Sequence, residues 1–210
     1  MTESHDIMTA NLDLNRIFNA VIFAARKHQG QVRKDERGSP YVTHPISVAQ
    51  VIFEIGKVRD TQTLIAAILH DTIEDTPTTH QEVKENFGED VLSVVLEVTD
   101  DKSLEKMKRK RLQVSHAPQL SHQARMIKIA DKLVNCGDIL VSPPNGWLIQ
   151  RRREYIQWGA DVVSQIRGTN PGLEAAFDHL LKEAEEQLDF SVQPFDSIDQ
   201  RPWGPEKPNP

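Results

Sequence analysis

The chain has 210 residues, 38% of them apolar and only 6% aromatic, and its 25 basic and 31 acidic residues give a net charge of −6. This length suits one domain with tails, and the negative charge argues against a general nucleic-acid or membrane surface. The single cysteine, Cys136, excludes an internal disulfide. Because there is also no basic leader and no apolar run of about 18 residues, we expect a soluble cytoplasmic protein.

Apolar residues recur at helical spacing along most of the chain, and no stretch shows the alternation that is typical of a strand. We therefore predict an all-α helical bundle, with a frayed N-terminus over residues 1–11, one domain over 12–188 and a Pro-rich, disordered tail over 189–210. The predicted helices cover, in order, residues 12–28, 45–55, 63–75, 79–87, 90–98, 123–140, 147–166 and 173–188.

The most unusual polar segment is His70-Asp71-Thr72-Ile73-Glu74-Asp75, which follows an apolar run and precedes Pro77. If residues 63–75 form one helix, side chains four apart share a face, and one imidazole and three carboxylates lie on adjacent stripes. Carboxylates this close raise one another's pKa unless a cation lies between them, and a divalent metal is the simplest such cation. The alternative is a solvated helix end, although a helix C-terminus disfavours negative charge.

Two other polar residues stand in apolar surroundings and are candidates to complete a metal site. His44 opens a predicted helix beside Pro45, and Asp131 follows a largely apolar run, where an unpaired carboxylate is costly to bury. With His70 and Asp71 they would make a mixed nitrogen and oxygen set, which suits Mn²⁺, Fe²⁺ or Zn²⁺ better than Ca²⁺ or Mg²⁺. Taken singly, His44 is more often a cap or core histidine, and Asp131 is more often half of a salt bridge.

The chain also contains a series of short motifs in a recognisable order: Phe23-Ala24-Ala25-Arg26-Lys27-His28, Arg33-Lys34, His44-Pro45, His70-Asp71, Glu74-Asp75, Val98-Thr99-Asp100-Asp101-Lys102 and Ile129-Ala130-Asp131-Lys132-Leu133-Val134-Asn135. Over about residues 12–185 these motifs resemble the HD-domain hydrolases of the RelA/SpoT type. The resemblance is closer still to the small stand-alone alarmone hydrolases of animals.

This resemblance implies a metal-dependent enzyme. It implies that one Mn²⁺ is bound by His44, His70, Asp71 and Asp131. It further implies that Glu74 and Asp75 manage the hydrolytic water and the proton transfers, as a coupled pair. The implied reaction removes the 3′-pyrophosphate of guanosine tetra- or pentaphosphate (ppGpp or pppGpp) and leaves GDP or GTP. Since the chain stops after the HD domain, we expect it to degrade the alarmone and not to make it.

Substrate-binding residues are less strongly indicated. Arg33 and Lys34 are the basic residues expected near the nucleotide, with a solvated loop as the alternative. Asn135 resembles the family's nucleoside-contacting asparagine, and Tyr155 is a weaker candidate for stacking or phosphate contact. The basic run over residues 106–111 is expected to be a solvated helix face, with a position over the pyrophosphate as the alternative.

Two other functions are compatible with the same motifs. One is an HD phosphohydrolase for another nucleotide, and removal of the 2′-phosphate of NADPH is the main rival, which the sequence does not separate from alarmone hydrolysis. The other is a non-catalytic nucleotide-sensing module, which predicts erosion of a ligand or an acid, whereas all six positions are intact. The expected partners are small nucleotides, with no nucleic acid and no membrane, and the sequence does not define an oligomeric state.

Overall fold

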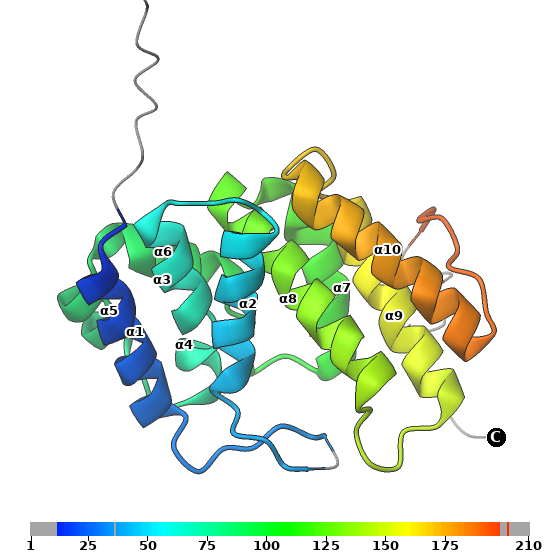
Figure 1. Ribbon diagram of the computed structural model, residues 1–210, viewed down its shortest axis with the longest axis horizontal. Helices are drawn as coiled ribbons and strands as arrows, with labels where there is room; N and C mark the ends of the chain where they lie inside the picture. The colour runs from blue at the N-terminus through cyan, green and yellow to red at the C-terminus, as the bar shows by residue number, and fades with distance from the viewer. Residues whose placement is uncertain (1–11, 36, 198–200, 202–210) are drawn as a thin grey trace, which may run out of the picture.

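The computed structural model describes residues 12–35, 37–197 and 201, and in this part of the chain the regular structure is helical (Figure 1). The strand-type pairing within it is one isolated antiparallel bridge between Val32 and Pro40. The prediction of an all-α protein is confirmed. No helix of this described part combines the length and the apolar composition needed to cross a bilayer.

Side-chain caps define where several of the helices begin. The α-helices are α1 (Leu14–Lys27), α2 (Thr43–Glu54), α3 (Thr61–Leu69), α4 (Thr72–Asp75), α5 (His80–Phe87), α6 (Glu89–Val98), α7 (Lys106–His116), α8 (His122–Val141), α9 (Ile149–Ser164) and α10 (Pro171–Leu188), and a 3-10 turn, η1 (Ala117–Gln119), joins α7 to α8. Five capping side chains each accept the backbone N–H three residues on: Asp13, Asp60, Thr79, Ser121 and Asn170.

The prediction of a single helix over residues 63–75 is wrong at its centre. Helix α3 ends one residue before His70, and α4 begins only at Thr72, so His70 and Asp71 occupy a turn. The Thr72 hydroxyl donates to the last carbonyl of α3 at 2.6 Å, a local bond that competes with the helical ladder. The Asp75 N–H still donates to the Asp71 carbonyl at 2.8 Å, so these two acids remain one turn apart.

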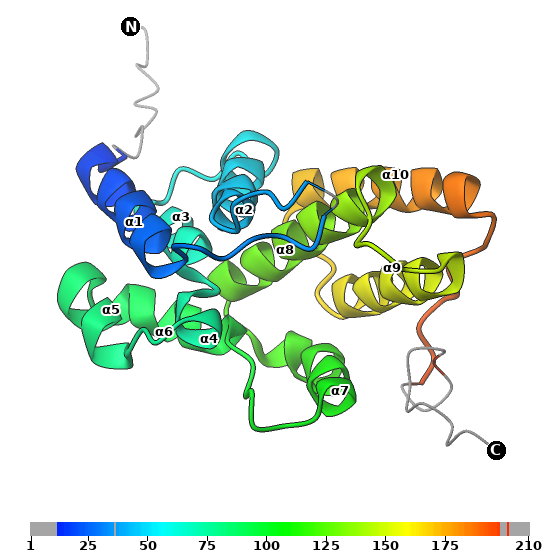
Figure 2. The same ribbon diagram turned by 90° about the horizontal axis from the view of Figure 1, so that it is seen from below.

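Helix α8 lies between two apolar cores. One core joins it to α1, α2, α3, α5 and α6, and the other joins it to α9 and α10, an arrangement that Figure 2 shows from below. Ile127 and Ala130 belong to the first core, whereas Met126 and Ile129 belong to the second. Burial of a large apolar side chain stabilises the folded state by about 1.5–3 kcal/mol. These contacts therefore hold α8 at the junction of the two cores, and with it Asp131.

The segment after α10 packs back onto α9, with apolar anchors that include Phe190, Val192 and Phe195. The guanidinium of Arg201 lies 2.8 Å from the Asp161 carboxylate, and both side chains are buried. The sequence predicts a tail that is disordered or loosely packed, and residues 189–197 and Arg201 are packed against the domain by these few contacts, which leave no periodic pattern in the sequence. The rest of that tail and the expected frayed segment 1–11 lie outside the described residues.

Candidate metal and catalytic site

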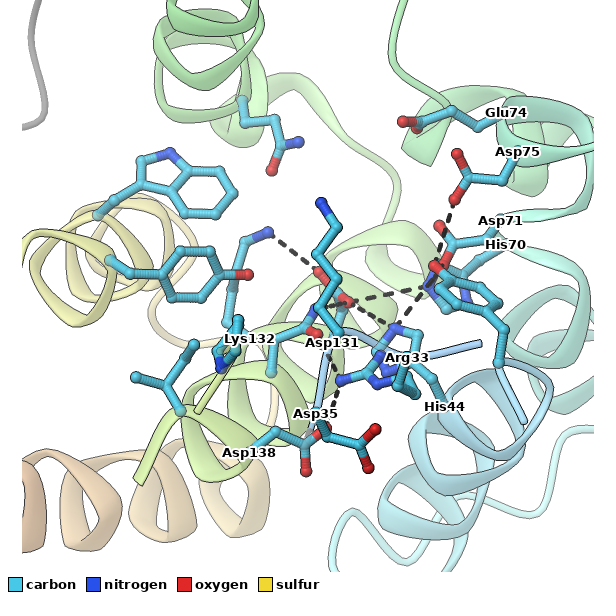
Figure 3. A pocket seen from close by; sticks show the side chains of 18 of the residues that line it. Arg33, Asp35, His44, His70, Asp71, Glu74, Asp75, Asp131, Lys132 and Asp138 are labelled. Atoms are coloured by element: carbon cyan, nitrogen blue, oxygen red, sulfur yellow. Dashed lines mark hydrogen bonds and ion pairs between the residues drawn. The ribbon is translucent and has the colours of Figure 1, made fainter. Parts of the chain in front are cut away.

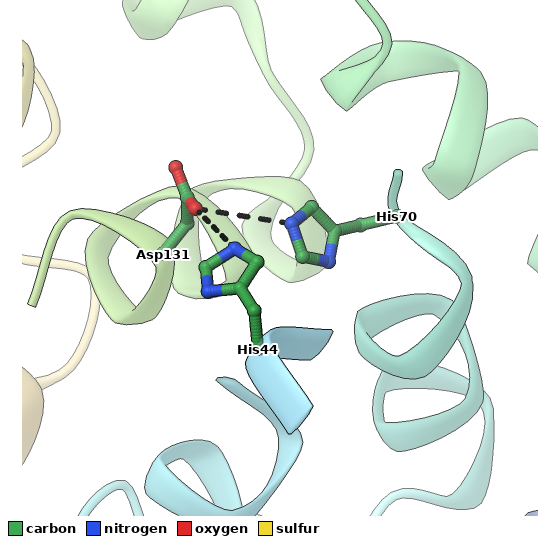
Figure 4. A group of neighbouring side chains, drawn as sticks. All are labelled: His44, His70 and Asp131. Carbon is green, nitrogen blue, oxygen red and sulfur yellow. Dashed lines mark ion pairs between the residues drawn. The ribbon is translucent and has the colours of Figure 1, made fainter. Parts of the chain in front are cut away.

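Three buried side chains meet in the structure, two from helices and one from the turn that follows α3. His44 comes from the start of α2, His70 from the end of α3 and Asp131 from the middle of α8, and one ligand atom of each lies within 4.8 Å of the others (Figure 4). The Nε2 atoms of His44 and His70 lie 3.1 Å and 3.8 Å from Asp131 Oδ1. Two imidazoles and a carboxylate that converge in this way could hold a metal ion.

Asp71 adds a second carboxylate to the cluster. Its Oδ2 lies 3.2 Å from His70 Nε2 and 3.7 Å from His44 Nε2. The hydroxyl of Tyr41 donates to the same oxygen at 2.5 Å and lies 3.2 Å from Oδ2 of Asp75. Tyr41 therefore orients one possible ligand and one possible catalytic acid together, as outer partners of metal ligands commonly do.

The ring nitrogens of His70 are arranged for a cation. Its Nδ1 lies 2.8 Å from the Ala67 carbonyl and donates to it, which leaves Nε2 as the atom that faces the carboxylates. This Nε2 is buried and makes no well-aligned hydrogen bond among the described residues, although it lies 3.2 Å from Asp71 Oδ2. A buried polar atom without a partner is unfavourable, and a divalent ion between the imidazoles and carboxylates would satisfy it. The residues present fit such a metal.

The charges of this cluster also need compensation. Burial lowers the pKa of His70, but the Asp71 and Asp131 carboxylates outweigh burial and raise that pKa to about 9. Burial raises the pKa of Asp131, yet Lys132 and the two imidazoles hold it well below its usual value. In the protein alone, a proton on His70 offsets part of the carboxylate charge, and a metal ion would displace that proton on binding.

Glu74 and Asp75 lie beside the metal cluster, on the same side as Asp71 (Figure 3). The backbone N–H of Asp100 donates to Glu74 Oε2 at 2.9 Å, which holds that carboxyl in place. Burial raises the pKa of Glu74, and the negative charges of Asp100 and Asp71 add to the rise. A carboxyl whose pKa is raised in this way is suited to exchanging protons with a substrate.

Two cations contact these acids. Nζ of Lys102, from the loop between α6 and α7, lies 2.5 Å from Asp75 Oδ1 and 3.4 Å from Glu74 Oε1. Arg109 of α7 lies 3.6 Å from Glu74 Oε1. The expectation that the basic run of α7 is only a solvated face is therefore wrong for Arg109, because the run has one side turned to the site.

The cluster opens into a cavity of about 550 Å³, a volume within the range of small-molecule sites. The cavity is lined by all ten residues that the sequence predicts for the site: Arg33, Lys34, His44, His70, Asp71, Glu74, Asp75, Asp131, Asn135 and Tyr155. Other lining residues were not predicted, among them Tyr41, Lys102, Lys132 and Trp158. Tyr41 stands in the segment Gly38-Ser39-Pro40-Tyr41, which also resembles the family and could have identified it as a site residue. Trp158, by contrast, has the spacing of an ordinary core residue.

The predicted nucleotide-binding residues form a connected set. Arg33 donates to Asn135 Oδ1 at 3.2 Å and pairs with Asp138, so its side chain is largely covered and is not a solvated loop residue. Asn135 in turn donates to Asp131 Oδ1 at 2.6 Å. This chain of contacts links the loop after α1 directly to the metal cluster. Burial raises the pKa of Tyr155 well above its usual value, so its hydroxyl stays protonated and can donate.

Comparison with known proteins places this geometry in a family. Residues 20–146 match the family model described as "HD domain", a span that includes the whole metal cluster. The chain is 50% identical over 168 residues, 80% of its length and 94% of the relative, to guanosine-3′,5′-bis(diphosphate) 3′-pyrophosphohydrolase MESH1 of Xenopus tropicalis. This chain belongs to the MESH1 family of HD-domain proteins. The predicted resemblance is confirmed.

Two further matches agree. The human MESH1 protein is 49% identical over 168 residues, which again cover 80% of this chain and 94% of the relative. A solved structure described as "a metazoan ortholog of SpoT" that "hydrolyzes ppGpp" superposes with a TM-score of 0.78 at 43% identity, and the match covers 80% of this chain and 94% of that one.

Proposed function

We propose that this chain hydrolyses ppGpp and pppGpp to pyrophosphate and GDP or GTP, with Mn²⁺ held by His44, His70, Asp71 and Asp131. The observation that carries the proposal is the meeting of these four side chains with Glu74 and Asp75 at one cavity. Its relatives in the MESH1 family are named 3′-pyrophosphohydrolases, and the cavity has the size and the charged groups that a phosphorylated nucleoside requires.

The reaction consumes one water molecule. A bond forms between the water oxygen and the phosphorus attached to the ribose 3′-oxygen, and the bond between that phosphorus and the 3′-oxygen breaks. The water loses a proton and the 3′-oxygen gains one, so that the products are a nucleoside 3′-hydroxyl and pyrophosphate. When bound, a divalent metal supplies an acidified water and polarises a phosphoryl oxygen.

The proton transfers fall to Glu74 and Asp75. Burial keeps the pKa of Glu74 raised, and the Asp100 N–H holds its carboxylate beside the metal cluster, where it accepts the proton of the attacking water. Asp75 is positioned by Tyr41 and Lys102. Because Lys102 contacts both carboxylates, we assign the proton transfers to the two acids together and not to a single base.

The nucleoside is held at the other end of the cavity. The guanidinium of Arg33 is fixed by Asn135 and Asp138 and presents a planar face on which a base can stack. Lys34 supplies a positive charge for phosphate, and Tyr155 supplies a hydroxyl donor and a ring. Asn135 lies between this region and Asp131, as expected for a contact to the ribose next to the reacting phosphate.

A steady-state competition tests the proposal. The purified protein receives Mn²⁺, ppGpp and NADPH together, and GDP, pyrophosphate, NADH and orthophosphate are all quantified. We expect GDP and pyrophosphate to dominate in equal amounts. Dominant NADH and orthophosphate would retain the hydrolytic site and overturn the substrate. Chelation followed by addition of Mn²⁺, Zn²⁺ or Mg²⁺ in separate samples tests the metal, and we expect Mn²⁺ to restore the highest turnover.

A further inference from the structure

The chain after α10 turns back toward α9, as Figure 2 shows, and we call residues 189–197 together with Arg201 the C-terminal strap. The strap lies beyond residues 12–185, over which the motifs of the family run. None of its described residues lines the catalytic cavity, and no step of the proposed reaction uses it. Its contacts with α9 are nevertheless specific and partly buried.

Two buried polar side chains of α9 hold the strap. Gln157 and Asp161 lie one turn apart and are only 4% and 1% exposed. The Gln157 amide accepts the N–H of Gln193 at 2.8 Å and donates to the Gln193 carbonyl at 2.9 Å. The Arg201 guanidinium pairs with Asp161 at 2.8 Å and donates to the Pro194 carbonyl at 2.7 Å. Because polar groups are costly to bury without partners, these contacts make the strap part of the folded domain.

The polar contacts place Phe195 on a small apolar cluster between α7 and α9. The buried members of this cluster are Val114 of α7 and Trp158 and Val162 of α9, and Phe195 packs against them. The guanidinium of Arg201 lies 5.3 Å from the centre of the Phe195 ring, so it contacts this side chain as well as the backbone before it. The strap therefore contributes an aromatic ring to the contact between two helices.

Helix α7 depends on this apolar cluster for its place in the fold. Only one of its eleven residues, Val114, is buried, whereas ten of the twenty residues of α8 are buried. Met107 packs against the same cluster, and Nε1 of Trp158 donates to the Lys110 carbonyl at 3.2 Å. A segment with few buried apolar contacts opens at a low cost in free energy. Loss of the Phe195 ring should therefore affect α7 more than it affects the deeply packed helices.

The position of α7 matters because one side of this helix forms part of the cavity wall. Its residues Lys106, Arg109 and Gln113 line the cavity. Arg109 lies 3.6 Å from Glu74 Oε1. Gln113 donates at 2.7 Å to the carboxylate of Asp100, the residue whose N–H holds Glu74. A displaced α7 would remove these groups from the cavity together.

We propose that the C-terminal strap holds α7 in place on the cavity wall, with Phe195 and Arg201 as positioning residues that act through Trp158. This role rests on the proposed function, because it concerns the binding of the same substrate. The metal ligands lie on or beside α2, α3 and α8, which the first apolar core holds together without the strap. Loosening of α7 therefore weakens substrate binding and leaves the metal in place.

The first test is Phe195→Ala in the full-length, Mn²⁺-loaded protein. Hydrogen exchange followed by mass spectrometry measures the protection of the α7 amides, residues 106–116, and we expect most of that protection to be lost. The KM for ppGpp should rise about fivefold, the factor expected when roughly one molecule in five holds α7 ready to bind. Bound substrate draws α7 back, so kcat should change by less than about twofold. Metal content should not change, and Phe195→Leu should restore most of the protection and the KM.

Phe190→Ala is the matched control. It removes the same ring from the same strap, but Phe190 packs against the second core, with α9 and α10, and not against the cluster that contacts α7. We expect this variant to be less stable to denaturant and to keep normal α7 exchange and a normal KM. Equal effects of Phe190→Ala and Phe195→Ala on α7 would reduce the strap to a general stabilising element and overturn the proposal.

Arg201→Met tests the same role through the polar contacts. It leaves the buried Asp161 carboxylate without the guanidinium, so the strap should detach and reproduce the loss of α7 protection and the rise in KM, and Arg201→Lys should restore part of both. Normal α7 exchange in Phe195→Ala and Arg201→Met would overturn the positioning role whatever the activity. A loosened α7 in variants of a protein that fails to hydrolyse ppGpp would refute the proposed function and leave the attachment of α7 by the strap confirmed.

Discussion

The two sides of the cavity are built in different ways. On the metal side, the side chains of His44 and His70 are 1% and 5% exposed, and they lie at the start of α2 and directly after α3, two helices packed into the core. Elsewhere around the cavity, the charged groups sit on loops and outer helix faces, and the side chains of Lys102 and Asp138 are 48% and 51% exposed. Packing preorganises the first side, whereas ion pairs hold the second.

This difference indicates what a substrate must change on binding. The metal side requires only the ion, because its ligands already converge. Elsewhere around the cavity, Lys102 is paired with Asp75, and Arg33 is paired with Asp138. Protein carboxylates therefore neutralise the cations that a phosphorylated substrate would contact. We therefore expect substitutions on the metal side to have large effects and substitutions on the exposed side to have graded ones.

The largest effect is expected for Asp131→Asn, which preserves shape and removes the charge shared by both imidazoles and Lys132. Metal binding and ppGpp hydrolysis should fall by more than about 100-fold, the upper range for loss of even an outer partner. Elemental analysis measures the metal bound per chain, and a turnover assay measures the loss of ppGpp hydrolysis. Asp138→Asn, two turns further along α8, is the control and should keep its metal. One tightly bound ion in the Asp131→Asn protein would show that the ligand set is wrong.

Glu74→Gln should retain the metal and lose proton transfer. We expect kcat to fall by about 10²- to 10⁴-fold, the usual contribution of a general acid or base, with metal content unchanged. Glu85→Gln, an exposed change on α5, controls for the loss of one carboxylate from the surface. Wild-type turnover by a metal-loaded Glu74→Gln protein would remove Glu74 from the mechanism.

Tyr41→Phe probes the link between the metal cluster and the acids. It removes the hydroxyl that donates to Asp71 and contacts Asp75, and outer-shell losses of this kind typically reduce metal affinity or activity by about 10- to 100-fold. Competition with a chelator measures the affinity, and single-turnover kinetics measures the chemistry. If both are unchanged, Tyr41 plays no part in organising the site.

The smallest effect is expected for Lys102→Met, on the exposed side. Lys102 lowers the pKa of Glu74 against the effect of burial, so its removal should raise that pKa further. Since Glu74 must be ionised to accept a proton, the acid limb of the kcat/KM profile should move to higher pH, with at most about a tenfold change on the plateau. Lys108→Met should leave the profile in place. A shift to lower pH would mean that another group titrates.

The sequence predicted most of the site because its chemistry is unusual. Taken singly, a histidine at a helix start and an aspartate after a buried run are more often structural, but acids at a helix end are disfavoured, and the combination of all three indicated a metal site. All ten predicted residues line one cavity, and the experiments above test the roles of Asp131 and Glu74 among them. Apolar spacing likewise predicted the helical class, since a buried helix face imposes its period locally.

Other features could not be predicted from local patterns. The break at His70 depends on the Thr72 hydroxyl, which takes a carbonyl that a continuous helix would use. The inward side of α7 depends on where the rings of Tyr155 and Trp158 offer their faces to Lys110. Neither contact leaves a periodic signal, so charge patterning alone favoured a solvated helix.

By itself, the sequence determined the helical class, the candidate ligands and the pair of acids, because these follow from residue type and short-range spacing. Only the tertiary structure decided that His44, His70, Asp71 and Asp131 meet, and that the Lys132 ammonium lies 3.0 Å from one of these carboxylates. The physical reason is that α2, α3 and α8 reach a common core by packing apolar faces against one another. Residues far apart in the chain become neighbours only when those faces are buried together.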